Sequence, residues 1–372
     1  MAKKWQILVQ DRRTRVRVGR IKTAHGVVET PCFIPDATYG AVKHLSALEL
    51  EQIGLQMILG NVYHLGIRPG VEVIKRLGGL RKFMAWSGPI LTDSGGFQAF
   101  SLVHRNGMGK ITEGGIVFKD HLSGAGHFLT PEQSIQNQLD LDSDILMVLD
   151  YPVVAEAPES VNRYSVSLTT QWAKRSRDYF RAQAGSEKIL MAIIQGANSK
   201  VLRRRSFEEL EAIESFIGYG FGGPPVNREI LAYTASLIPD DRVRYLMGGG
   251  TPKEIIEAVA MGWDLFDCVI PTRNARHGLA YVFEDEVKLR VGEIKIWQEQ
   301  YRFDSRPIEP HCPCLACQHY SRAYIRHLLK IREPLGQRLM TLHNLSFYMR
   351  LMKRIRKAIR KGEFSSLDLN TT

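Results

Sequence analysis

The stretch Ile145-Leu-Met-Val-Leu-Asp150 is a short apolar run that ends at a carboxylate. Seven similar runs are spaced along the chain, and each ends in polar or glycine residues: 30–34, 56–59, 89–91, 189–194, 215–221, 243–247 and 265–270. Short runs of aliphatic and β-branched residues that end in such residues are typical of strands. The sequence therefore predicts eight strands.

Segments with helical periodicity and capping signals separate most of these runs. Ser46-Ala-Leu-Glu49, Thr130-Pro-Glu-Gln133 and Thr251-Pro-Lys-Glu254 carry the capping-box pattern, and the last two add Pro at the first helical position. Strands that alternate with helices pair in parallel through right-handed crossovers. Eight such units favour an α/β fold closed into a (β/α)8 barrel of the TIM type, with an open doubly wound sheet as the alternative.

Residues capable of chemistry follow the C-terminal ends of these runs, or lie within the last of them: Asp93, Asp150, Gln195, Gly222-Gly223, 248–250 and Asp267. The active site of a (β/α)8 barrel forms from those ends, so residues scattered along the chain would meet there. The glycines at 248–250 lack the Lys-Ser/Thr of a phosphate-binding P-loop, and 220–223 fits no dinucleotide fingerprint.

Asp93 and Asp267 form a candidate pair of carboxylates at this end. Two glycines follow Asp93 in Leu91-Thr-Asp-Ser-Gly-Gly-Phe-Gln98, which allows close approach of substrate, and Arg273 and Arg276 follow Asp267. Paired carboxylates can break a glycosidic bond through a covalent sugar–enzyme intermediate. Arginines nearby would bind phosphates as planar forks. Each Asp, taken alone, could also be a buried structural residue.

Cys312, Cys314 and Cys317 lie within six residues of one another. Three thiolates this close can converge on one tetrahedral zinc ion, which leaves a fourth position for a histidine. A coincidental cysteine-rich turn is the alternative. Because this run follows the last predicted strand, it indicates a zinc-binding subdomain inserted near the last βα unit.

The net charge of +11 favours a polyanionic partner, although a basic protein without such a partner would show the same total. Residues 350–361 carry seven cations and no carboxylate, and their apolar spacing predicts an amphipathic helix. No stretch approaches the roughly 20 apolar residues of a membrane span. The N-terminal residues lack the apolar core of a secretory signal, and the cysteines suit metal, so we expect no membrane partner and a cytoplasmic location.

The chain resembles the bacterial-type tRNA-guanine transglycosylases, or queuine tRNA-ribosyltransferases, over essentially its whole length. The segments that carry the resemblance are Gly60-Asn-Val-Tyr-His-Leu65, Arg68-Pro-Gly70, Leu91–Gln98, Leu129-Thr-Pro-Glu132, Gln195-Gly196, Tyr245-Leu-Met-Gly248, Phe266-Asp-Cys268, Pro271-Thr-Arg273 and Cys312-x-Cys-x2-Cys317. The resemblance implies that guanine at the wobble position (34) of tRNA is exchanged for a free 7-deazaguanine base, preQ1 or queuine. It also implies a covalent ribosyl-aspartate intermediate, a bound Zn2+ and a homodimer with the zinc region near its interface.

The same resemblance implies a role for each candidate residue. Asp267 would be the nucleophile, and Asp93 the general base that deprotonates the incoming base. The edge of the base would be bound by Asp150, Gln195 and the Gly223 N–H, and its ring would lie between Phe97 and Met247. The tRNA backbone would be bound by Arg273 and Arg276, and the zinc ion by Cys312, Cys314, Cys317 and His343.

One segment departs from the family pattern. Gly222-Gly-Pro-Pro-Val-Asn-Arg-Glu229 replaces the usual Gly-Gly-Leu-Ala-Val-Gly-Glu beside the 7-substituent of the incoming base. Two prolines remove backbone donors, and an arginine replaces an acid. An enzyme that prefers queuine over preQ1 is therefore the alternative reading. A non-catalytic tRNA-binding subunit, a sugar hydrolase and an archaeal-type relative acting elsewhere in tRNA rank below it.

The expected organisation has four parts. Residues 1–30 form an N-terminal extension that caps the barrel, and 31–275 form the barrel body with the active site. Residues 276–345 form the zinc-binding subdomain region, and 346–372 form the C-terminal basic helix and tail.

Overall fold

The computed structural model describes residues 4–11, 14–107, 109–154, 157–223, 227–364 and 367. Eight parallel strands close into a barrel in the order β10-β11-β12-β13-β14-β4-β5-β6. They are β4 (Cys32–Ala37), β5 (Ile58–Gly60), β6 (Ile90–Thr92), β10 (Ile145–Met147), β11 (Ile189–Ile194), β12 (Gly218–Phe221), β13 (Val243–Leu246) and β14 (Leu265–Cys268). Each predicted run supplies one strand, so the (β/α)8 prediction is confirmed.

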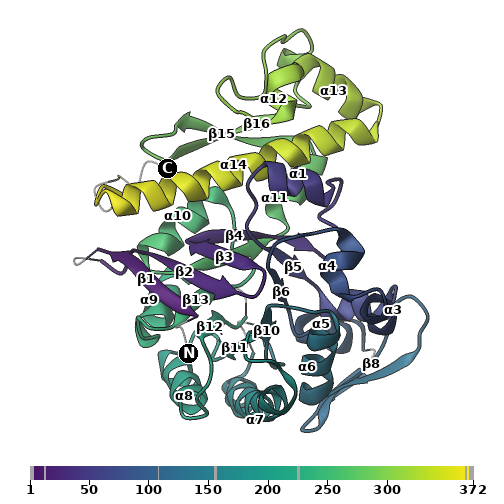
Figure 1. Cartoon of the computed structure of the whole chain (residues 1–372), viewed down its shortest axis with the longest axis vertical. Helices are drawn as coiled ribbons and strands as arrows, with labels where there is room; N and C mark the ends of the chain where they lie inside the picture. Colours follow the sequence, from purple (N-terminus) through teal and green to yellow (C-terminus); the bar gives the residue numbers. More distant parts are fainter. Residues whose placement is uncertain are drawn as a thin grey trace.

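Helices follow these strands and cover the barrel (Figure 1). They are α1 (Ala47–Gln52), α2 (Val62–Ile67), α3 (Val71–Arg76), α4 (Gly79–Met84), α5 (Gly96–Asn106), α6 (Pro131–Asp140), α7 (Glu159–Gln183), α8 (Lys200–Glu211), α9 (Arg228–Leu237), α10 (Pro252–Ala260) and α11 (Ile270–Arg276). Reciprocal capping boxes begin α1 at Ser46 and α10 at Thr251. At α6 only the Thr130 half forms, because the Gln133 side chain donates to Asn137 instead.

Two small antiparallel sheets are added to the barrel. The first joins β1 (Trp5–Gln10), β2 (Arg17–Thr23) and β3 (Gly26–Thr30), and the second joins β7 (Gly109–Thr112), β8 (Gly115–Lys119) and β9 (Gly126–Leu129). Buried Arg17 donates two hydrogen bonds to buried Asp264, at 3.0 and 2.6 Å. Because Asp264 directly precedes β14, this pair ties the first sheet to the end of the barrel opposite the strand C-termini.

The segment after α11 folds around one long helix. It contains the hairpin β15 (Leu279–Asp285) and β16 (Arg290–Lys295), the 3-10 turn η1 (Glu299–Tyr301), and the helices α12 (Leu315–His319), α13 (Arg322–Lys330) and α14 (Pro334–Arg360). Figure 1 shows α14 lying between the barrel and the α12–α13 region. The hydroxyl of Tyr348 on α14 donates to the Gly250 carbonyl at 2.7 Å. The expected division at 345/346 falls inside α14.

The basic segment 350–361 is helical up to Arg360, as predicted, and its apolar face is buried. Several of its arginines bind the chain's own acids: Arg350 pairs with Glu309, Arg354 with Glu286, and Arg360 with Glu29. Much of this positive charge therefore forms ion pairs that hold α14 against neighbouring segments of the chain. In the described part of the chain, no helix is long and apolar enough to cross a membrane.

Candidate active site and metal centre

Asp267 lies within β14, close to the C-terminal end of the barrel, and its side chain is 9% exposed. Its Oδ1 accepts hydrogen bonds from the Tyr245 hydroxyl at 2.7 Å and from the Gly248 N–H at 3.0 Å. Among the described residues, none donates a hydrogen bond to Oδ2. Burial raises the pKa of Asp267, while the two donors oppose that rise by stabilising the carboxylate. One oxygen is held in place and the other is available to react.

Asp93 directly follows β6, and a second set of donors fixes its carboxyl group. Oδ1 accepts from the N–H groups of Val62 and Gly95, at 3.0 and 3.2 Å, and Oδ2 accepts from the Asn61 side-chain amide. Burial and the charges of Asp267 and Asp150 raise the pKa of Asp93 to about 7. A carboxyl group with a pKa near neutrality can both take and give a proton in solution at that pH.

Asp150 and Gln195 follow the neighbouring strands β10 and β11 and contact each other. The Gln195 Nε2 donates to the Asp150 Oδ2 at 2.7 Å, and the fully buried Gln195 Oε1 has no partner among the described residues. A Cβ at Gly222 would lie 2.5 Å from Gln195 Nε2, so only glycine leaves room for this amide. Burial raises the pKa of Asp150 to about 7. The two side chains thus present a carboxylate and an amide, and Gly223 follows them with φ of +85°.

The remaining candidates follow strands β6, β13 and β14, at the same end of the barrel. Phe97, at the start of α5, is 58% exposed, whereas Met247 is partly buried after β13. Arg273 and Arg276 lie on α11, one helical turn apart, and Arg273 is exposed. The Arg276 Nη1 is buried without a hydrogen-bond partner in the described structure, and burial together with Arg273 lowers its pKa. This unpaired guanidinium nitrogen suits an anionic ligand.

Cys312, Cys314, Cys317 and His343 form a buried cluster whose ligand atoms all lie within 4.8 Å of one another. The His343 Nδ1 lies 3.7, 3.8 and 3.3 Å from the three sulfur atoms in chain order. Tetrahedral zinc, with bonds of about 2.3 Å to sulfur and about 2.0 Å to nitrogen, would place these atoms at similar separations. The His343 Nε2 lies 2.8 Å from the Tyr281 carbonyl, which selects the tautomer that leaves Nδ1 free for a metal. The residues therefore fit a four-coordinate metal ion, and the predicted ligand set comes together.

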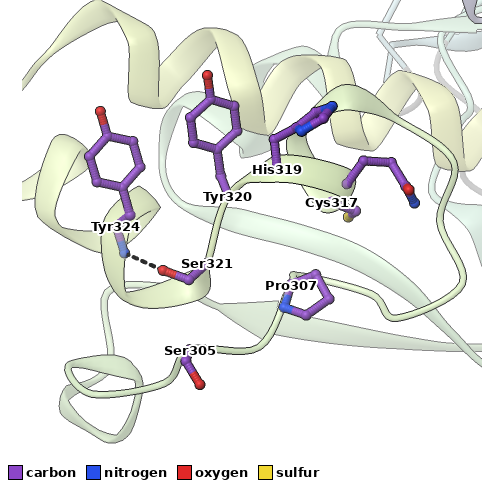
Figure 2. A pocket seen from close by; sticks show the side chains of 8 residues that line it. Ser305, Pro307, Cys317, His319, Tyr320, Ser321 and Tyr324 are labelled. Carbon is purple, nitrogen blue, oxygen red and sulfur yellow. Dashed lines mark hydrogen bonds between the residues drawn. The ribbon is translucent and has the colours of Figure 1, made fainter.

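A pocket opens on the surface beside this cluster, lined by Cys317, His319, Tyr320 and Tyr324 among others (Figure 2). The rings of Tyr320 and Tyr324 stack with centroids 5.5 Å apart, and the Ser321 hydroxyl accepts from the Tyr324 N–H at 3.2 Å. None of the carboxylates described above lines this pocket. It therefore belongs to the metal region and is separate from the barrel site.

The family model described as queuine tRNA-ribosyltransferase matches residues 11–370. The chain belongs to the queuine tRNA-ribosyltransferase family. Curated relatives with that name are similar over nearly their full length. The protein from Solidesulfovibrio magneticus is 45% identical, covering 94% of this chain and 92% of its own. The protein from Nitrosomonas eutropha is 46% identical, covering 97% of both chains. This transferase is accordingly a pentosyltransferase that acts on tRNA.

Three polar residues of this transferase's site received no role from the sequence. Asn61 holds Asp93 and also caps α2, because its Oδ1 accepts from the His64 N–H at 3.0 Å. Tyr245 holds Asp267 from within β13. Asp36 lies in β4, two residues past the end of the first predicted run, 30–34. The rule that selects Asp93 and Asp150, a carboxylate just past an apolar run, points to Asp36 as well.

Proposed function

We propose that this transferase exchanges guanine at position 34 of tRNA for a free 7-deazaguanine base through a covalent ribosyl–Asp267 intermediate. The observation that carries the proposal is the hydrogen bonding of Asp267: its Oδ1 is held by two donors while Oδ2 is unengaged among the described residues. The charge of Asp267 also contributes to raising the pKa of Asp93 to about 7. Family membership supports the reaction class.

The two displacements balance without a redox or nucleotide cofactor. Asp267 Oδ2 attacks C1′ of the target ribose, the C1′–N9 bond breaks, and protonated Asp93 gives its proton to the departing guanine. Asp93 then takes the N9 proton of the incoming base, whose N9 attacks C1′ and breaks the bond to Asp267. Two inversions restore the original configuration at C1′.

The base-edge residues account for selection of guanine. The Asp150 carboxylate can accept from the N1–H and the exocyclic amine, while the Gln195 amide and the Gly223 N–H can donate to O6. In the free protein the Gln195 amide is bound to Asp150, so guanine replaces that hydrogen bond. Adenine would leave these groups unpaired, which makes its binding unfavourable. Phe97 and Met247 would cover the two faces of the ring and replace the stacking lost from the anticodon loop.

A wash-out assay tests the proposed exchange. Radiolabelled guanine is placed at position 34, and its release by free preQ1 or queuine is followed with wild type, Asp267→Ala and Asp241→Ala. Asp241 is an exposed acid at the opposite end of the barrel and serves as the control. We expect release only with wild type and Asp241→Ala, and an enzyme–RNA adduct on denaturing gels that depends on Asp267. Unchanged release by Asp267→Ala would overturn the role of Asp267 as nucleophile, whereas no release by wild type would favour the non-catalytic tRNA-binding reading.

The sequence departure at 222–229 supports a preference for queuine over preQ1 within this proposal. Residues 224–226 lie outside the described residues. In the described part of the segment, Arg228 pairs with Glu257 at 3.3 Å. The Glu229 carboxylate already pairs with Lys200 of α8. A small aminomethyl group would then find no unpaired carboxylate in that described part. Parallel incorporation assays with the two free bases decide this, and equal or better use of preQ1 removes the preference.

We infer that the metal of the Cys3His cluster is zinc, with a structural role, since four protein ligands close its coordination shell. When bound, zinc would tie α12 to α14. From the family resemblance we also propose that the enzyme works in the cytoplasm as a homodimer with the zinc region near the interface. Sedimentation of the metal-loaded protein tests the dimer, and a monomer at all concentrations would overturn it.

A further inference from the structure

Asp36 is a third carboxyl group at the mouth of the barrel. The parallel register pairs Asp267 with Ile34 across β14 and β4. Register partners, and residues two apart along a strand, point to the same face of a sheet, so Asp36 shares a face with Asp267. On its other side β4 pairs with β5, which in turn pairs with β6, the strand that leads to Asp93. Asp36 therefore lies on the wall between the two proposed catalytic carboxylates.

The closed strand order also places Asp36 relative to the base. Asp150, Gln195 and Gly223 follow β10, β11 and β12. In a ring ordered β10-β11-β12-β13-β14-β4-β5-β6, β4 is diametrically opposite β11. A base held by Gln195 and its neighbours, with its C1′ at Asp267, extends its sugar away from β11. The sugar then faces β4 and Asp36.

Only one hydroxyl group of that sugar is free to meet a side chain there. A nucleotide inside a tRNA has its 3′ and 5′ oxygens in phosphodiester bonds. The 2′-hydroxyl remains, on the carbon next to C1′. It is also the group by which a protein distinguishes RNA from DNA. A hydrogen bond to this hydroxyl strengthens as positive charge develops at C1′.

The hydrogen bonding and the protonation of the Asp36 carboxyl group suit a contact with the 2′-hydroxyl. In the part of the chain that the structure describes, no residue donates a hydrogen bond to its carboxyl group. Burial and the charges of Asp267 and Asp93 raise the pKa of Asp36 well above its usual range. Because Asp267 keeps the Tyr245 and Gly248 donors and Asp36 has none, Asp36 is the member of the pair that holds the proton. A protonated carboxyl group can accept from a hydroxyl and donate at the same time.

We propose that Asp36 binds the 2′-hydroxyl of the nucleotide whose base is exchanged, and so selects ribose over 2′-deoxyribose at that position. This inference rests on the proposed function, since it needs Asp267 to act at C1′. Asp36 becomes a substrate-contacting residue of the exchange reaction, on the sugar side of the site.

The test uses an anticodon stem-loop RNA and the same RNA with a single 2′-deoxyguanosine at position 34. Guanine exchange is measured as kcat/KM for wild type, Asp36→Val, which removes the polar group, and Asp36→Asn, which retains a hydrogen-bonding side chain. An RNA with 2′-deoxy substitution at position 33 is the substrate control. Circular dichroism confirms that each variant is folded. The comparison between enzymes cancels the greater intrinsic lability of a deoxynucleoside.

We expect the ribose-over-deoxyribose ratio at position 34 to fall at least fivefold in Asp36→Val, mostly through loss of activity on the all-ribose RNA. Asp36→Asn keeps part of the ratio, and substitution at position 33 leaves all three enzymes equally affected. An unchanged ratio in Asp36→Val overturns the inference. Failure of the proposed function looks different, because wild type would then release no guanine from either RNA.

Discussion

The Tyr245 hydroxyl donates to the Asp267 Oδ1 at 2.7 Å, from the strand directly beside β14. This hydrogen bond stabilises the carboxylate form of a buried acid whose burial alone favours the neutral form. It also fixes the carboxyl plane, so that Oδ2 is presented to the substrate. In the proposed reaction, Tyr245 would thus favour the ionised form of the nucleophile without touching the reacting atoms.

Tyr245→Phe removes this donor without a large change in volume. A hydrogen bond to a charged group contributes about 1.5–3 kcal/mol, so we expect exchange at neutral pH to fall roughly 10- to 100-fold. Because the pKa of Asp267 rises further, the loss relative to wild type should shrink as the pH is raised. The measurement is the pH profile of guanine exchange for both enzymes. Equal losses at every pH would mean that Tyr245 acts only on packing.

The pH dependence of the wild-type enzyme follows from two carboxyl groups. Burial raises the pKa of both Asp93 and Asp150 to about 7 in the free protein. In the proposed reaction Asp150 must be ionised to accept from guanine, whereas Asp93 must carry the proton that it gives to the departing guanine. We therefore expect kcat/KM for tRNA to fall on both sides of about pH 7, with a slope of about one on each side. A flat profile down to about pH 5 would contradict these assignments.

The barrel could be predicted from the sequence because each strand is a local apolar run with its own boundary. The carboxylates that are proposed to act in catalysis could be assigned to one end of the barrel for the same reason, since strand ends converge in this fold. The residues that donate hydrogen bonds to those carboxylates could not be predicted in this way. Asn61 and Tyr245 act through side-chain hydrogen bonds to strands or turns far away in sequence, and no local pattern marks such pairs. Asp36 resembles any strand-end acid until the register shows which strands flank it.

The zinc region shows the same limit. Three cysteines within six residues define a metal site locally, whereas His343 follows Cys317 by 26 residues and is implied as a ligand by the family resemblance. The position of His343 beside the cysteines depends on how α14 packs against the rest of the chain. The sequence leaves the role of the basic face of α14 equally open, and the structure shows that four of its arginines pair with Glu29, Glu286 or Glu309.

His343→Ala tests the metal centre. Loss of one of four ligands should release the ion and separate α12 from α14, because structural zinc contributes on the order of 10 kcal/mol in small zinc domains. Even half of that, at about 2 °C per kcal/mol, lowers the thermal midpoint by roughly 10 °C. Elemental analysis should find one zinc per wild-type chain and little in the variant. His319→Ala, an exposed histidine of α12, is the matched control and should keep both its metal and its midpoint.

Arg276→Ala tests the proposed contact with the tRNA backbone. A guanidinium that binds one phosphate releases about one counterion, so the slope of log affinity against log salt should decrease in size by about 1. Weaker binding should extend to tRNAs of any anticodon. Arg181→Ala is the control, since Arg181 lies near the C-terminal end of α7, at the other end of the barrel. The same salt slope in wild type and Arg276→Ala would rule out a phosphate contact.

Asp36→Val should raise the stability of the folded protein, with an effect that grows with pH. The folded-state pKa of Asp36 lies well above the unfolded value of about 4, so the folded protein binds the proton more tightly. The tighter proton binding stabilises the folded wild-type protein, and this stabilisation is complete below about pH 4. It is lost as pH rises toward the folded pKa, at about 1.4 kcal/mol per pH unit. Denaturant unfolding of wild type and Asp36→Val at about pH 5 and pH 8 measures the difference. We expect the variant's advantage to be larger at pH 8 than at pH 5, whereas Asp241→Ala should show no such trend. A variant that is less stable than wild type at both pH values would mean that the Asp36 carboxyl group stabilises the fold through contacts of its own.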